Sequence, residues 1–114
     1  MDLIQTLKWI AVFITLAFGL YAMVKPGMIE RFTGLSPSSP RGISEIRAVM
    51  GGTFVGLGIA AVVLNSPQTF KMLGISYAVI AVIRTISMVL DKSVTRSNTI
   101  SLIAETALAI TLVL

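Results

Sequence analysis

The chain contains neither cysteine nor histidine, and the two absences exclude several kinds of chemistry. Without thiols there are no disulfides, and without imidazoles the usual zinc, copper and haem sites cannot form. A Ser–His–Asp or Cys–His nucleophile is also impossible within this chain. We therefore expect no metal and no cofactor, and an enzyme is the less favoured kind of function.

Charge is also scarce, because only 12% of the residues are charged and 55% are hydrophobic. A mean hydropathy of +0.93 leaves too little polar surface to coat a soluble globule of 114 residues. The net charge is +4, but the basic residues lie at the ends of the predicted helices and form no stripe, and aromatic platforms are missing, so we expect no nucleic-acid partner. The composition places the chain in a membrane, with membrane lipids as its first partners.

The chain is predicted to form a single transmembrane domain, 1–114, that contains four apolar segments. A spanning helix needs about 20 apolar residues, and the predicted spans are about 3–24, 43–64, 69–90 and 98–114. Ser97 or Asn98 is expected to cap the last span. Between the first two spans, proline and glycine interrupt the pattern, and Met28, Ile29 and Phe32 predict a short interfacial helix. The predicted fold is all-α, an integral membrane four-helix bundle.

Small residues recur at four-residue spacing on two of the predicted spans, which lets neighbouring helices approach closely. The first set is Ala11, Thr15 and Gly19, and the second, called here the small-residue seam, is Ala48, Gly52, Gly56 and Ala60. These residues are predicted to pack helices within the bundle or between copies, so a homo-oligomer or a larger membrane complex is possible. Gly51 and Gly58 lie on another side of the same span.

Basic residues gather at one side of the predicted spans. Most lie in the first and third loops or the adjoining helix ends, whereas Lys8 and Lys71 are on the other side; the larger set is Lys25, Arg31, Arg41, Arg47, Lys92 and Arg96. The positive-inside rule then places both loops in the cytoplasm and both termini outside.

Among the charged residues within the predicted spans, Arg84 and Glu105 are the best indication of a site. Arg84 is six residues from the cytoplasmic end of the third span, about 9 Å deep, and Glu105 lies at a similar depth in the fourth. An unpaired charge at such a depth costs at least about 2.5 kcal/mol, so we expect the two to meet. Helical spacing puts further polar residues on the same faces or at the same side, and the predicted polar cluster is Glu45, Arg47, Arg84, Ser87, Asp91, Asn98, Ser101 and Glu105.

The segment from Glu45 to Gly52, EIRAVMGG, followed by an apolar span and then by Arg84 and Asp91, resembles the bacterial membrane family called domain of unknown function 4345. That family looks like a relative of the DoxX-type four-helix membrane proteins. The resemblance implies the same bundle architecture, no settled activity, and a place in the bacterial inner (plasma) membrane.

Several functions agree with this pattern. The leading hypothesis is a noncatalytic membrane binding or accessory protein, whose cytoplasm-facing polar pocket takes a lipid-like or quinone-like amphiphile. A hypothesis of equal weight is that Arg84 and Glu105 form a structural pair, which fixes helix register without any ligand. A third is a small proton-coupled transporter working as an oligomer, which would need Glu105. A fourth is a membrane enzyme acting on a lipid or isoprenoid, with Glu45, Asp91 or Glu105 as acid or base.

Overall fold

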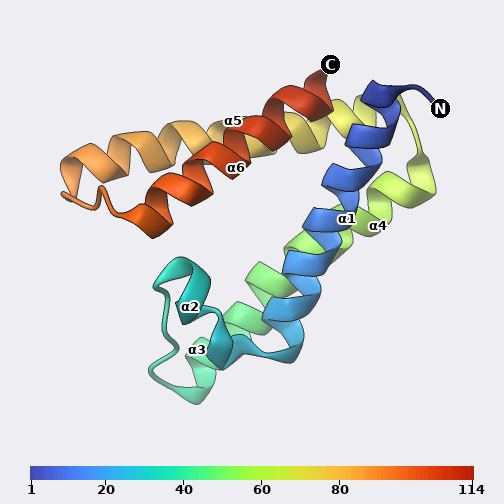
Figure 1. Ribbon diagram of the computed structural model, residues 1–114. Helices are drawn as coiled ribbons and strands as arrows, with labels where there is room; N and C mark the ends of the chain where they lie inside the picture. Colours follow the sequence, from blue (N-terminus) through green and yellow to red (C-terminus); the bar gives the residue numbers. More distant parts are fainter. The chain divides into compact units, whose positions relative to one another are not determined.

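The computed structural model describes residues 1–114, and every regular element in it is helical. The elements are α1 (Leu3–Val24), η1 (Pro26–Met28), α2 (Glu30–Thr33), α3 (Pro40–Glu45), the π-helical η2 (Ile46–Gly51), α4 (Gly52–Leu64), α5 (Pro67–Leu90) and α6 (Arg96–Val113) (Figure 1). Elements α3, η2 and α4 follow one another as one helical stretch, Pro40–Leu64. The chain divides into two compact units, residues 12–65 and residues 1–11 with 66–114, which are described separately.

Three helices begin where a hydroxyl side chain in extended backbone accepts a hydrogen bond from a backbone N–H of the first turn. Ser39 accepts from Gly42 before α3, Ser66 from Thr69 before α5, and Thr95 from Asn98 before α6. The cap of α6 is thus Thr95, and the expectation of Ser97 or Asn98 was wrong. Proline follows both serines at the first helical position, where its missing N–H costs nothing. These caps start the helices two or three residues before the predicted spans.

In the unit of residues 12–65, α1 packs against the helix that contains η2 and α4. A Cβ added to Gly19 would lie 2.7 Å from the Val55 amide nitrogen and 2.8 Å from the Gly51 carbonyl oxygen, so the two backbones are in direct contact. Phe18 and Phe54 meet edge to face, with ring centroids 5.2 Å apart. The two backbones approach this closely only because glycine occupies positions on both sides of the contact.

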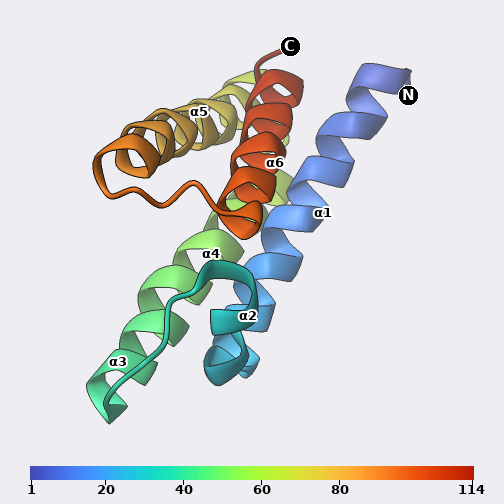
Figure 2. The ribbon, with the colours of Figure 1, turned by 60° about the vertical axis from the view of Figure 1, so that its left-hand side comes forward.

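The helix α2 lies beside the C-terminal end of α1 (Figure 2). The Tyr21 and Phe32 rings join them, with centroids 5.3 Å apart, and Ala22, Ile29 and Ile46 form a buried cluster. Short helices therefore occupy the region where an interfacial helix is predicted; their position relative to a membrane stays a prediction.

The small-residue seam does not form the contact with α1. Gly51 and Gly58 do, since a Cβ at either position would collide with Met23 or Leu16 respectively, whereas a Cβ at Gly56 would meet nothing within 4 Å. Four residues overshoot one α-helical turn by about 40°, so a seam at that spacing drifts around the helix. The π-helical turn from Ile46 to Gly51, which holds more residues per turn, changes the register further.

The other unit is built around an antiparallel hairpin of α5 and α6, joined by residues 91–95. The helices approach closely at Gly74, where a Cβ would lie 2.9 Å from the Leu112 Cβ and 2.8 Å from a Val113 methyl group. The start of α1 adds Trp9, whose ring meets Phe70 edge to face at 5.3 Å, and Lys8, whose Nζ lies 5.9 Å from the centre of the Phe70 ring.

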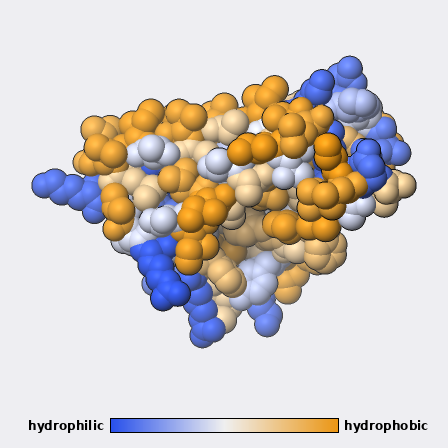
Figure 3. Space-filling model, turned by 45° about the horizontal axis from the view of Figure 1, so that its top comes forward, coloured by the Kyte–Doolittle hydropathy of each residue, from blue (hydrophilic) through white to orange (hydrophobic).

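Three helices are long and apolar enough to cross a membrane, namely Leu3–Val24, Pro40–Leu64 and Pro67–Leu90. Large hydrophobic side chains such as Phe13, Val63 and Val89 are exposed along them, and orange, hydrophobic residues cover most of the face shown in Figure 3, with hydrophilic residues mainly at its margins. A surface of this kind matches hydrocarbon rather than water. The α6 helix carries Arg96, Asn98 and Glu105 and is not among the three, so the fourth span and the four-helix bundle remain predictions.

Candidate functional site

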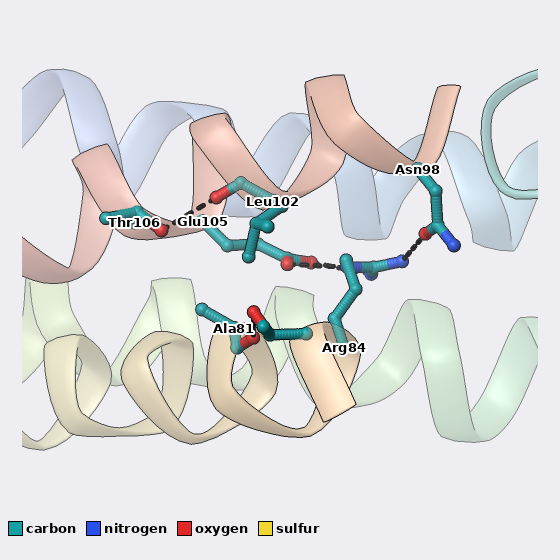
Figure 4. A network of polar contacts seen from close by, with 7 residues as sticks. Ala81, Arg84, Asn98, Leu102, Glu105 and Thr106 are labelled. Atoms are coloured by element: carbon teal, nitrogen blue, oxygen red, sulfur yellow. Dashed lines mark hydrogen bonds and ion pairs between the residues drawn. The ribbon is translucent and has the colours of Figure 1, made fainter. Parts of the chain in front are cut away.

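Arg84 and Glu105 form an ion pair between α5 and α6. The two helices run antiparallel and are joined by a short connection, so a residue in the last third of α5 faces one near the middle of α6. The Arg84 Nε donates to Glu105 Oε1 at 2.7 Å, and Nη2 donates to Oε2 at 2.7 Å (Figure 4). Two parallel charge-assisted bonds of this length are the strongest geometry available to an arginine and a carboxylate.

Asn98 completes the contacts of the guanidinium. The Arg84 Nη1 donates to Asn98 Oδ1 at 2.6 Å, and the Asn98 Nδ2 donates in turn to the Ser93 carbonyl oxygen at 3.0 Å. The hydroxyl of Thr95 accepts from the Asn98 backbone N–H at 3.1 Å. The amide of Asn98 is therefore oriented from both ends, with its oxygen toward Arg84. In Figure 4, Arg84 reaches from α5 between Asn98 and Glu105 of α6.

The pair is only partly shielded. The Glu105 side chain is 13% exposed and that of Arg84 is 31% exposed, so the carboxylate is the more deeply buried partner. A guanidinium carries five N–H hydrogens, and three of them are donated to Glu105 and Asn98. Two N–H groups of a partly exposed arginine are left for another acceptor.

An open groove of about 400 Å³ lies beside this guanidinium. Its lining comes mainly from α5, and the residues are Val79, Ile80, Ile83, Arg84, Ser87 and Asn98. The α5 residues follow at helical spacing, so that one face of the helix supplies both an apolar wall and a polar end. The polar residues of this face were predicted from the sequence. The apolar ones were missed, although Ile80 lies one helical turn before Arg84 and was the available signal.

The remaining predicted residues of α5 and α6 divide into two groups. The Ser87 hydroxyl donates to Asp91 Oδ2 at 2.6 Å, at the end of α5, and both residues are thus close to the site in sequence and partnered with each other. Ser101 lies on α6 between Asn98 and Glu105 but contributes no hydrogen bond to the network. The structure therefore assembles Arg84, Asn98 and Glu105, with Ser87 at the groove.

Glu45 and Arg47 belong to the unit of residues 12–65, and their contacts lie within it. Glu45 accepts from the Arg41 Nε at 3.2 Å on an exposed helix face. The Arg47 Nη1 donates to the Met23 carbonyl oxygen at 2.8 Å, so Arg47 satisfies a carbonyl at the end of α1. All hydrogen bonds of Arg84 go to Glu105 and Asn98 instead.

The residues predicted to pack the first span are placed differently from those of the small-residue seam. Ala11 and Thr15 are buried, at 2% and 0% exposure, and Gly19 touches the backbone of the neighbouring helix. In the seam, Ala48, Gly52, Gly56 and Ala60 are only partly buried or exposed. The close contact between the two helices in this unit thus joins Gly19 to Gly51, and Gly58 lies against Leu16.

The carboxylates do not gather into a metal site, since no group of three or more forms in the structure. What the network offers is one arginine whose charge is matched by one glutamate, beside an apolar groove.

A comparison with known protein families identifies the family of this chain. A family model described as Domain of unknown function (DUF4345) matches residues 3–114. The chain belongs to this family. Both the Arg84–Glu105 pair and the EIRAVMGG segment of this DUF4345 chain lie within the matched range. No curated protein and no solved structure matches the chain, and the relation to DoxX-type proteins stays a prediction.

Proposed function

We propose that this DUF4345 protein is a noncatalytic membrane protein that binds a lipid-like or quinone-like amphiphile in the groove beside Arg84. The observation that carries the proposal is the composition of one groove wall, in which Val79, Ile80 and Ile83 adjoin a guanidinium with two undonated N–H groups. Ligand sites are mostly apolar clefts of about 300–1,000 Å³ with a few oriented polar groups, and the groove, at about 400 Å³, fits that description.

The geometry of the network supports a binding role over a reaction. A proton-transferring carboxylate at the groove would favour a reaction, and the groove lining contains none. Glu105 instead holds Arg84 through both of its oxygens, which fixes the guanidinium in one orientation. A fixed donor beside an apolar wall suits recognition of an amphiphile's polar head.

The setting of the proposal is the bacterial inner membrane. The protein crosses it four times with α6 as the last span, both loops rich in basic residues face the cytoplasm, and the groove opens toward that side. Pairing supports this arrangement, because Glu105 on α6 is matched by Arg84 and contributes no isolated charge.

Native mass spectrometry from a mild detergent tests the proposal. The wild-type protein, expressed in bacteria, is expected to carry a co-purifying amphiphile that Arg84→Gln loses. Arg41→Gln is the matched control, because Arg41 also pairs with a glutamate but its side chain is 83% exposed on another helix. A wild-type protein without any bound small molecule, even after incubation with membrane lipid and quinone extracts, would rule the binding function out.

A further inference from the structure

The chemistry of the groove specifies the kind of head group as well. We infer that the site selects an uncharged amphiphile whose head presents a carbonyl oxygen, and that it discriminates against anionic heads of the same length. This inference rests on the proposed binding function and adds a ligand class to it.

Charge balance is the first step. Arg84 is the only charged residue of the groove lining, and its charge is matched by Glu105 through two hydrogen bonds of 2.7 Å. An anion entering the groove would therefore meet a neutral pair rather than a free cation. It would have to compete with Glu105 for the guanidinium or remain beside the partly buried Glu105 carboxylate, and both cost free energy where the dielectric constant is low.

Donor and acceptor inventory is the second step. Arg84 has two N–H groups left, and arginine can only donate. The Asn98 oxygen already accepts from Arg84, and the Asn98 Nδ2 donates to Ser93. The Ser87 hydroxyl donates to Asp91, so its hydrogen is engaged. The Ser87 and Asn98 oxygens can only accept further hydrogen bonds. The two remaining Arg84 N–H groups are thus the free donors of the lining, and they require an acceptor.

An acceptor that carries no charge, is planar enough to meet a guanidinium edge, and continues into an apolar chain satisfies both steps. The carbonyl of a quinone and the carbonyl of a carboxylic ester share this chemistry. The apolar wall of Val79, Ile80 and Ile83 would contact the attached chain, since burial of apolar surface is favourable.

The test uses the full chain in nanodiscs of zwitterionic ether lipids, which contain no carbonyl that could compete. Three probes are titrated, namely methyl tetradecanoate, a decyl-substituted benzoquinone and tetradecyl sulfate, which stays ionised. We expect at least one carbonyl probe to bind about tenfold more tightly than the sulfate, which corresponds to about 1.4 kcal/mol. The tighter of the two carbonyl probes shows whether the natural source is an ester lipid or a quinone.

A variant then tests the cause of the preference. Glu105→Gln removes the charge that matches Arg84, and it is expected to raise the affinity for tetradecyl sulfate about tenfold while changing that for the carbonyl probes much less. Glu45→Gln, the same substitution at an exposed ion pair, is expected to change neither. If Glu105→Gln does not fold, the wild-type comparison of ester and sulfate still decides.

The outcomes separate the two claims. A wild-type protein that binds sulfate as tightly as the ester and the quinone overturns the inference about the head group and leaves amphiphile binding intact. A wild-type protein that binds none of the three probes overturns the proposed function itself. Unchanged sulfate binding in a folded Glu105→Gln protein refutes charge matching as the reason for the selectivity.

Discussion

Single substitutions of the two partners of the ion pair should lower the free energy of unfolding by different amounts, and the difference follows from the burial of each side chain. Arg84→Gln leaves the Glu105 carboxylate, 13% exposed, without a cation, whereas Glu105→Gln leaves a guanidinium that is 31% exposed and still bonded to Asn98. Breaking a buried pair by removing one partner costs about 3–5 kcal/mol. The larger loss is therefore expected for Arg84→Gln.

Partial exposure and the remaining hydrogen bonds reduce both values. We expect Arg84→Gln to lower the free energy of unfolding by about 3 kcal/mol and Glu105→Gln by about 2 kcal/mol. The double variant replaces the pair by two neutral amides, which can bond to each other and leave no isolated charge, so its loss should also be about 2 kcal/mol. The interaction energy between the two positions is then about 3 kcal/mol.

Reversible unfolding in bicelles, followed by steric trapping or by detergent titration, measures these differences. The matched control is the same cycle at Arg41 and Glu45, an exposed pair separated by one helical turn, for which the interaction energy should be about 0.5 kcal/mol or less. Additive losses at Arg84 and Glu105, with a double variant near 5 kcal/mol, would show that the two charges do not stabilise each other and would refute the reasoning about the site.

Two further predictions concern packing and topology. Gly19→Ala should destabilise the protein by about 1–3 kcal/mol, because the added Cβ would collide with backbone atoms of the neighbouring helix. Gly56→Ala should be neutral or slightly stabilising, because a Cβ there meets nothing within 4 Å. Equal losses of stability for the two variants in an unfolding titration would contradict this assignment of the helix contact. Since the chain has no cysteine, single cysteines introduced at Ser38, Asn65 and Ser93 report its orientation in the membrane. A membrane-impermeant maleimide added to intact spheroplasts should label Asn65→Cys only. Labelling of the other two variants instead would show that the orientation is the opposite of the one proposed.

The long helices and the meeting of Arg84 with Glu105 were accessible from the sequence because they depend on local information. Hydropathy over about 20 residues predicts a span, and a short connection makes consecutive helices antiparallel neighbours. Two charges at similar distances from such a connection can then face each other, as Arg84 and Glu105 do. The capping residues Ser39 and Ser66 begin their helices before the apolar run, which is why the predicted starts came late.

The face of the second long helix that packs against α1 could not be predicted from the sequence in the same way. The pattern of Ala48, Gly52, Gly56 and Ala60 assumes an uninterrupted α-helix, and the π-helical turn at Ile46–Gly51 breaks that assumption without an obvious sequence signal. The role of Asn98 in holding the guanidinium was missed for a different reason. Spacing alone placed it on the right face, but its choice of Arg84 as partner depends on Ser93, whose carbonyl and hydroxyl oxygens accept from the Asn98 Nδ2 and orient the amide.

The closeness of the α5–α6 hairpin in the chain has a consequence for biogenesis. Only residues 91–95 separate the two helices, and the cation of one is neutralised by the anion of the other. If they leave the insertion machinery as a joined pair, neither has to carry a lone charge into lipid, a step that costs about 2.5–3.5 kcal/mol for an arginine or aspartate at the helix centre. With α6 as the proposed fourth span, the more polar helix would depend on the preceding one for its insertion, and a long linker inserted between the two is expected to leave Glu105 without its cation during that step.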